Sequence, residues 1–321
     1  MKQPKLHQLM QAIARLSWRQ RRVLQAQLAA LQAREASIEA IESQAPDHCP
    51  NCGGTHFVKN GFARGLQRFL CRGCARTFNA LTGTPLSKLH LRGKWLAYAQ
   101  AIDQGLSIPQ VAQQLDIAWS TAFRWRHRFL QLPSQRQACA LHGIAEADES
   151  YFLESCKGQR ALARKARRRG GKASQRGVSK QQIPVLMARD RAGATANIIV
   201  ARTSAAELSA ALAPLLPKDT VLCTDSSSSL AAAAQLLGVQ HHSINVSAGI
   251  RVDGPWHVQN VNAYVSRLRG WMRRFKGVAT KYLASYLGWF RMLDCTPGAA
   301  PQPASVRSEE RRVGKECRSR W

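Results

Sequence analysis

The order of apolar and polar positions divides the chain into a helical first part and a β-rich second part. Residues 5–44 carry apolar side chains at helical spacing and contain no glycine, so we expect helices that end before Pro46. Residues 88–132 follow the same pattern, with Gly105 and Pro109 as breaks between helices. The first 132 residues are therefore predicted to be mainly helical, apart from a different segment in between.

Short apolar runs that favour strands begin near residue 143. They predict five strands, at 144–153, 183–189, 195–201, 220–223 and 241–246. Helical runs at 205–216 and 231–237 separate the later strands. Strands that come first and then alternate with helices predict a mixed α/β sheet, so the whole chain is expected to be a multidomain α+β protein.

Charge narrows the classes of function. The chain has 47 Lys and Arg against 19 Asp and Glu, a formal net charge of +28, which favours a polyanionic partner. Basic residues run through several unlike segments, which disfavours a lipid surface, and neither a membrane span nor a secretory signal is expected from the apolar pattern. Nine cysteines without an export signal indicate a reducing compartment, so we expect a cytoplasmic protein that handles nucleic acid.

Two pairs of cysteines with eighteen residues between them stand in the segment that follows the first helices. Their C-x-x-C spacing suits four thiolates around one structural Zn²⁺ and predicts a zinc ribbon, with strands at 57–58 and 67–70. Gly53 and Gly73 are expected to give the two turns their backbone freedom. A redox dithiol and unrelated cysteines are the alternatives. The predicted zinc ligands are Cys49, Cys52, Cys71 and Cys74.

Residues 106–130 favour a helix-turn-helix. Ser107 is a suitable N-cap with Pro109 in the first turn, residues 116–118 make the turn, and a second helix begins at Trp119. The second helix would enter the major groove, while Phe123 and Phe129 are expected to pack inward; an ordinary helical hairpin is the alternative. The predicted DNA contacts are Ser120, Thr121, Arg124, Arg126 and Arg128.

Carboxylates are scarce, and two of them are placed to share a metal ion. Strand alternation puts Glu146 and Asp148 on one face and Glu149 on the other, and the expected strand Val221–Thr224 runs directly into Asp225. If the two strands are neighbours, Asp148 and Asp225 converge on divalent cations such as Mg²⁺, whose preferred ligands are hard oxygens. A pair of such ions suits phosphodiester chemistry.

A third metal ligand is expected on the helix that begins near His257. Between residues 226 and 293 the only carboxylate is Asp253, in an expected loop. The helix instead offers Asn262, which has a neutral carbonyl oxygen, and Arg269, two turns further along the same polar face and suited to a phosphate. Asp253 and Glu149 are the substitutes for Asn262.

Five stretches together resemble insertion-sequence transposases of the DDE superfamily, specifically the IS1595 family. They are CPNC…CRGC, TAFRWRHRFL, ADESYFLES, LCTD and HVQNVNAYVSRLRGWMRRFKGVATKYLASYLGW. The resemblance implies a ribonuclease-H-like catalytic domain that cuts and joins DNA ends with Mg²⁺ or Mn²⁺. It also implies metal ligands at Asp148, Asp225 and Asn262 and an end-binding role for Arg269. The run Ser226–Ser229 departs from many relatives, which have glycine there.

A basic insertion at 157–180 holds ten Lys or Arg and no acid. Directly after the strand with Asp148, it is expected to grip backbone phosphates through side chains such as Arg167, Arg168 and Arg169. A solvated loop without function is the alternative.

These interpretations give a domain plan and a function. The expected domains are a helical arm (1–46), a zinc ribbon (47–80), a helix-turn-helix domain (86–135), a ribonuclease-H-like domain (143–295) and a tail (296–321), of which 307–321 looks like a translated sequencing adapter. The expected function is a bacterial, nucleoid-associated transposase that binds the terminal inverted repeats of an insertion sequence as a homo-oligomer on double-stranded DNA. The alternatives are a catalytically inactive, DNA-binding transposase relic and a nuclease that cuts without joining.

Overall fold

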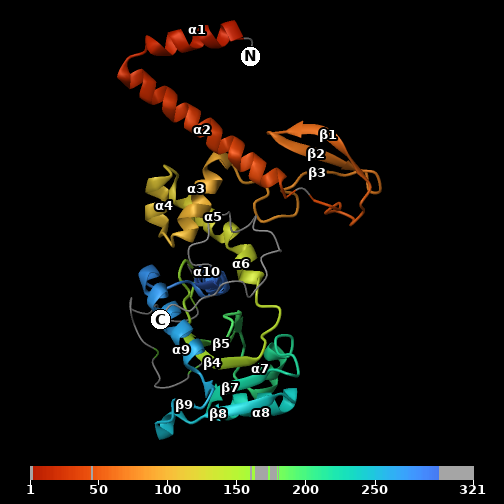
Figure 1. The fold of residues 1–321 in the computed structure, drawn as a ribbon, viewed down its shortest axis with the longest axis vertical. Helices are drawn as coiled ribbons and strands as arrows, with labels where there is room; N and C mark the ends of the chain where they lie inside the picture. The colour runs from red at the N-terminus through yellow and green to blue at the C-terminus, as the bar shows by residue number, and fades with distance from the viewer. Residues whose placement is uncertain are drawn as a thin grey trace. The chain divides into compact units, whose positions relative to one another are not determined.

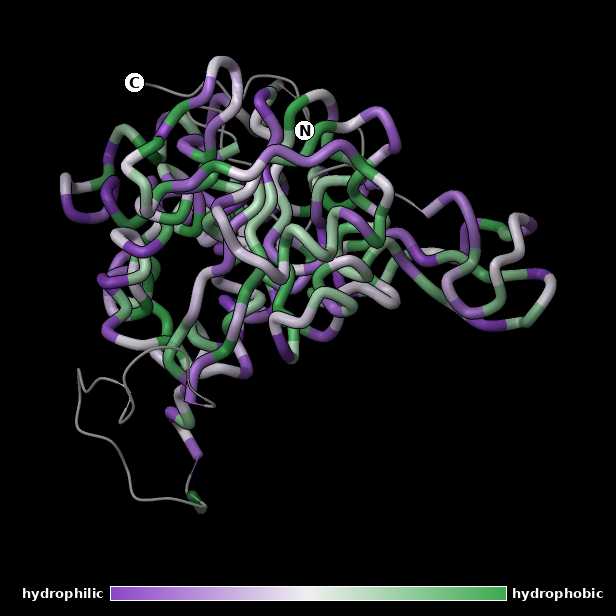
Figure 2. The backbone as a smooth tube through the Cα atoms, turned by 90° about the horizontal axis from the view of Figure 1, so that it is seen from below, coloured by the Kyte–Doolittle hydropathy of each residue, from purple (hydrophilic) through white to green (hydrophobic). Residues whose placement is uncertain are grey.

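A computed structural model describes residues 3–44, 46–159, 161, 162, 173, 179 and 181–295. They form two compact units, and the boundary between them falls inside one helix, between Trp125 and Arg126. Short hydrophobic and hydrophilic stretches alternate along the chain (Figure 2), and within the described residues no helix has the length and apolar character needed to cross a bilayer.

The first unit begins with two helices, α1 (Gln3–Ala14) and α2 (Trp18–Glu42), which confirms the helical prediction for residues 5–44. Ser17 separates them and caps α2: its side chain accepts a hydrogen bond from the Gln20 N–H, while the Gln20 side chain accepts one from the Ser17 N–H. The arm is therefore a pair of consecutive helices.

A small antiparallel sheet follows, with strands β1 (Phe57–Ala63), β2 (Leu66–Cys71) and β3 (Thr77–Phe78). Its apolar cluster consists of three aromatic rings, those of Phe57, Phe69 and Phe78, packed with cysteines; the ring centroids lie 5.2–5.5 Å apart. So small a core contributes little hydrophobic stabilisation, and this part depends on another source of folding energy.

The next helices are η1 (Arg92–Lys94), α3 (Trp95–Asp103), α4 (Ile108–Gln114) and α5 (Trp119–Phe129), which confirms the helical prediction for residues 88–132 (Figure 1). Tyr98 of α3 donates a hydrogen bond to the Ala122 carbonyl and packs its ring against Trp125, with centroids 5.2 Å apart. The ammonium of Lys94 donates to the carbonyls of Leu115 and Asp116 (2.6 and 2.8 Å), and so holds the turn between α4 and α5.

The second unit is built on one five-stranded mixed sheet. The strands are β4 (Ile144–Leu153), β5 (Gln182–Asp190), β6 (Thr195–Ile199), β7 (Val221–Asp225) and β8 (Gln240–Ile244). Their order is β6-β5-β4-β7-β8; β4, β7 and β8 run parallel, and β5 runs antiparallel to both of its neighbours. All five predicted strands are present, and this is the ribonuclease-H-like arrangement.

Helices and short turns complete the second unit. They are α6 (Gln131–Gln135), α7 (Ala205–Leu212), α8 (Ser228–Leu237), η2 (Val246–Ala248), the hairpin β9 (Val252–Asp253) and β10 (Trp256–His257), α9 (Gln259–Met272), η3 (Arg273–Phe275), η4 (Thr280–Tyr282) and α10 (Leu283–Cys295).

Alternate residues of β4 face different helices. Ala145 and Ala147 belong to the same buried cluster as Leu208 of α7 and Leu230 of α8. Glu146, one residue out of phase, contacts the start of α9 instead. The sheet is therefore covered by α7 and α8 on one face and by α9 on the other (Figure 1).

Polar contacts connect α9 and α10 to the sheet and to each other. Arg189 of β5 donates to Asp294 of α10 (2.7 Å), and Arg267 of α9 donates to the same carboxylate (2.8 Å). Asn197 of β6 donates to the Tyr264 hydroxyl of α9 (2.7 Å). These contacts fix the helix that the sequence predicts to carry the third metal ligand.

Candidate metal centre and nucleic-acid interface

Four cysteine sulfurs of the first unit surround one point. Each lies within 4.8 Å of the others, with Cys49 Sγ 3.8 Å from Cys74 Sγ and Cys52 Sγ 3.6 Å from Cys71 Sγ. Four thiolates at about 2.3 Å from a tetrahedral Zn²⁺ would lie about 3.8 Å apart. The donor set therefore fits zinc and is compatible with a zinc ribbon.

The two cysteine turns share one backbone pattern. The Cys49 N–H donates to the Gly54 carbonyl (2.8 Å), and the Cys71 N–H donates to the Arg76 carbonyl (3.0 Å). Gly53 has a left-handed φ of 75°, as expected, but the equivalent position in the second turn is Ala75 (φ 55°). The expectation that Gly73 supplies this freedom was wrong, because the left-handed residue follows the second cysteine of the pair.

The helix-turn-helix elements have the predicted bounds. Ser107 caps α4 through a capping box with Gln110, and Asp116 adopts a left-handed φ of 47° in the turn. On α5, Ser120, Arg124 and Arg128 are exposed and Thr121 is partly exposed. These four side chains are accessible to DNA.

Two expectations for α5 were wrong. Phe123 is 44% exposed rather than packed inward. Arg126, predicted to contact DNA, is fully buried in the second unit, where its guanidinium lies 4.8 Å from the centre of the Trp289 ring. A buried cation over an aromatic face stabilises the fold, so the Arg126 side chain is not available to contact DNA.

Carboxylates of the second unit meet where the middle of β4 lies beside the carboxyl end of β7. The parallel register pairs Ala147 with Thr224, so Asp148 and Asp225 come next on adjacent strands. Carboxylate oxygens of Asp148, Glu149 and Asp225 all lie within 4.8 Å of one another. The predicted convergence of Asp148 and Asp225 is therefore present, and Glu149 joins them.

Burial and neighbouring like charges both raise pKa values in this cluster. Burial, and then the neighbouring Asp225, raise the pKa of Asp148 to about 6. Burial, followed by Asp225 and Asp148, raises the pKa of Glu149 to about 7. A divalent cation bound among the three carboxylates would stabilise the ionised forms of Asp148 and Glu149, so the donor set fits Mg²⁺ or Mn²⁺.

The serine run after Asp225 has a local structural role. Ser227 is the N-cap of α8; its N–H donates to Asp225 Oδ1 (3.2 Å), and its hydroxyl donates to Glu149 Oε1 (3.4 Å). These two bonds orient the carboxylates of Asp225 and Glu149. The run Ser226–Ser229 therefore supports the carboxylate cluster through Ser227.

Arg269 reaches the cluster from α9. Its Nη2 donates to the Ser150 hydroxyl (2.9 Å), and its positive charge opposes the rise in the pKa of Asp148. Asn262 is exposed two turns earlier on the same helix. Asp253 is exposed on β9 and lies outside the carboxylate cluster.

Glu146 anchors the start of α9. This fully buried carboxylate accepts a hydrogen bond from the Val261 N–H (2.9 Å) and lies 3.1 Å from Arg191 Nε and 3.3 Å from His257 Nδ1. Strand alternation predicts that Glu146 lies on the same face of β4 as Asp148. No sequence pattern identifies its partners Arg191 and His257, or Ser150, as residues of the site. The predicted phosphate contacts Arg167, Arg168 and Arg169 lie outside the described residues.

Comparison with known families matches both units. Residues 140–291 match the ISXO2-like transposase domain, and residues 94–133 match a homeodomain-like domain. An uncharacterized protein in transposable element ISH50 of Halobacterium salinarum is 29% identical over 250 residues, which cover 76% of this chain and 84% of that protein.

Solved structures resemble the chain only weakly. A simian T-cell lymphotropic virus intasome in complex with PP2A regulatory subunit B56 gamma has a TM-score of 0.28 at 12% identity, covering 68% of this chain and 77% of its own. A pre-cleavage Mos1 transpososome has a TM-score of 0.21 at 14% identity, covering 62% and 75%.

Proposed function

Since residues 140–291 match the ISXO2-like transposase domain, we propose that this chain is a transposase of the IS1595 family, which binds the terminal inverted repeats of an insertion sequence and cuts and joins DNA strands there. The observation that carries the proposal is the convergence of Asp148 and Glu149, in the middle of β4, with Asp225 at the end of the parallel strand β7. The relative in element ISH50 supports the same class of protein.

DNA recognition is assigned to the first 135 residues in this proposal. Ser120, Thr121, Arg124 and Arg128 of α5 would contact phosphates and base edges, with the zinc ribbon beside the helix-turn-helix in the chain. The insertion with Arg167, Arg168 and Arg169 would add contacts to phosphate that are independent of sequence. The formal net charge of +28 favours such contacts.

The chemistry is assigned to the carboxylate cluster and α9. Asp148 and Asp225 would hold Mg²⁺ or Mn²⁺, with Asn262 or Glu149 as a third ligand. Bound there, the metal would activate the attacking water or 3′-hydroxyl and stabilise the leaving oxygen. Arg269, held against Ser150, would bind a phosphate next to the carboxylates.

The proposal includes more than one copy of the chain on DNA, because joining two element ends needs two active sites in one complex. The second candidate is an inactive relic that occupies the ends without cutting them. Asn262, a neutral side chain where the DDE pattern has a carboxylate, favours that candidate. Glu149 argues against it, since it supplies a third carboxylate from β4.

A strand-transfer assay tests the proposal. The full chain is mixed with DNA that carries the element's terminal repeats, in Mg²⁺ and in Mn²⁺. The wild type is expected to give joined product and Asp225→Asn none, while Asp253→Asn, the same substitution outside the cluster, behaves as the wild type. End binding without cleavage in either metal would leave the relic as the correct reading. Equal cleavage by Asp225→Asn would refute the proposed site.

A further inference from the structure

Charge is divided into two blocks along the helical arm. Residues 1–34 contain seven Lys and Arg and no acid, whereas residues 35–47 contain four acids and no Lys or Arg. Within α2 this places Arg19 and Arg21 in the first turn and Glu39 and Glu42 in the last. The partial charges of a helix favour the reverse order, with acids at the start and bases at the end. The stability of α2 by itself therefore does not account for this distribution.

Apolar side chains of α2 are exposed in the same region. Trp18, Val23, Leu28 and Leu31 are 67%, 60%, 50% and 54% exposed. Leu24, Leu28 and Leu31 follow one another at spacings of four and three, so they form a line on one face of the helix. Such a line of apolar side chains is typical of a helix face that packs against another helix.

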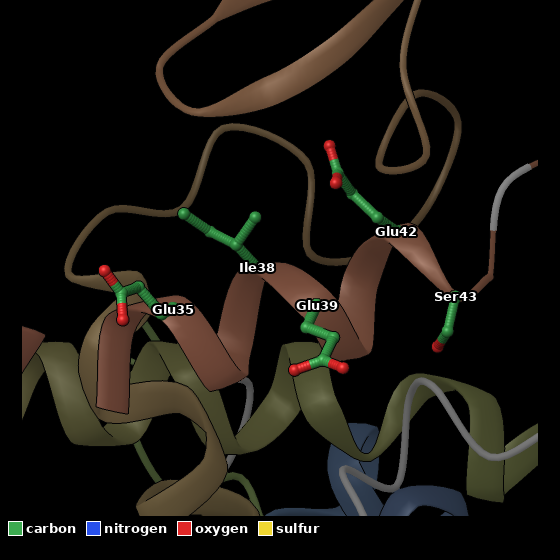
Figure 3. Close-up of a pocket in the computed structure, with 5 residues that line it drawn as sticks. All are labelled: Glu35, Ile38, Glu39, Glu42 and Ser43. Atoms are coloured by element: carbon green, nitrogen blue, oxygen red, sulfur yellow. The ribbon is translucent and has the colours of Figure 1, made fainter. Parts of the chain in front are cut away.

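The contacts of α2 inside its own unit come from its second half. Ile38 packs at Gly65, Arg34 packs at Gly93, and Glu42 accepts a hydrogen bond from the Gln67 N–H (2.8 Å). Beside these contacts, Glu35, Ile38, Glu39, Glu42 and Ser43 line a surface hollow (Figure 3). Both Glu35 and Glu39 are exposed there, so an acidic surface and an apolar line lie on one helix.

We infer that α2 pairs in antiparallel orientation with α2 of a second copy of this chain. The centre of α2 is residue 30, between Leu28 and Leu31, so an antiparallel pair about a two-fold axis places these leucines in the middle. The basic start of each helix then meets the acidic end of the other, and the two helix dipoles oppose favourably. Parallel pairing would place like charges side by side.

Other occupants fit α2 less well. Helix α1, folded back, would bring no acid to Arg19 and Arg22, because the first acid in the chain is Glu35. DNA would suit the basic half, but it would meet the carboxylates of Glu35 and Glu39 and would leave the leucine line exposed to water. A second α2 satisfies both charge blocks and the apolar line together.

Charge reversal in the full chain tests the pairing, with molar mass measured by light scattering after gel filtration and by sedimentation. One variant carries Arg19→Glu and Arg22→Glu; another carries Glu35→Arg and Glu39→Arg, so that Glu42, which bonds the ribbon, is untouched. Wild type is expected to be a dimer. Each variant should raise the dimer dissociation constant about tenfold or more through like-charge contacts. A control for the arginine variant carries Arg202→Glu and Lys218→Glu, which make the same charge change on exposed residues of the other unit. It should stay a dimer.

Complementation gives the orientation. An equimolar mixture of the two variants should form heterodimers, since α2 of one variant is then largely acidic and α2 of the other largely basic. A single chain with all four substitutions should dimerise again, because antiparallel pairing still joins opposite charges. A monomeric wild type, dimeric single variants, or a four-substitution chain that stays monomeric would each overturn the inference. Loss of DNA affinity in the arginine variant with no change in molar mass would assign the basic half to DNA instead.

Discussion

Gly288 lies where α10 packs on α6, and Gly288→Ala is expected to destabilise the second unit strongly. A Cβ at this position would lie 2.4 Å from the Pro133 carbonyl oxygen and 2.6 Å from Ser134 Cα. Both neighbours are backbone atoms, so no side chain can rotate away. Arg291, which is 6% exposed, donates to the same Pro133 carbonyl (2.8 Å) and to the Arg136 carbonyl. The methyl group therefore disturbs a buried charged hydrogen bond as well as the packing.

The magnitude follows from these distances. Real Cβ contacts are no shorter than 3.0 Å, so α6 and α10 must separate by about 0.6 Å or more. Overpacking of this kind costs about 1–3 kcal/mol, and a weakened hydrogen bond to a buried guanidinium adds about 1–2 kcal/mol. We expect the free energy of unfolding to fall by about 3 kcal/mol.

Urea unfolding followed by tryptophan fluorescence measures the effect, because Trp271 and Trp289 lie in this unit. Gly270→Ala on α9 is the matched control, since its Cβ would meet nothing within 4 Å. It is expected to stabilise the helix by about 0.5–1 kcal/mol. A Gly288→Ala protein as stable as the wild type would refute the close packing of α6 and α10.

Three further predictions concern the metals, pH and DNA. Zinc analysis of the purified chain should give one Zn²⁺ per chain. Cys52→Ser should lose both this zinc and the protection of the β1–β3 amides against hydrogen exchange; full protection without zinc would contradict the thiolate site. Burial, reinforced by the charges of Arg126 and Lys281, lowers the pKa of His127 in the folded state from 6.5 to about 4. Between pH 6.5 and pH 4 the His127 ring therefore becomes protonated in the unfolded state and stays neutral in the folded state. The free energy of unfolding should therefore fall as pH drops from about 6.5 to about 4, and His127→Phe, which keeps a ring on Tyr282, should reduce that dependence; an unchanged pH profile would refute it. Arg269→Ala should lower the salt slope of end binding by about one phosphate contact, whereas Arg202→Ala should not.

Local features of the fold were predictable from the sequence because their causes are local. Ser107 and Gln110 are three residues apart and form a capping box, so the start of α4 follows from neighbouring residues. The two C-x-x-C pairs are local signals of the same kind, because each brings two thiolates of the ribbon together within four residues. Asp148 and Asp225 needed one further condition, the adjacency of their strands, which the parallel pairing of β4 and β7 satisfies.

Long-range contacts account for what sequence reasoning missed. Arg126 has the charge and position of a DNA contact, but Trp289, far along the chain, covers it. Arg191 and His257 become partners of Glu146 only when α9 packs on the sheet. Strand alternation predicts that Glu149 is separated from Asp148. Its carboxylate nevertheless lies within 4.8 Å of those of Asp148 and Asp225.

Metal-dependent cleavage of element ends by Asp225→Cys tests the central claim most directly. A thiolate is a poor ligand for Mg²⁺ and a better one for softer cations, so exchanging the ligand should change which metal supports the reaction. If Asp225 binds the catalytic metal, the variant should yield no cleaved DNA in Mg²⁺ and should recover cleavage in Mn²⁺. Cleavage at the wild-type rate in Mg²⁺ would contradict the account.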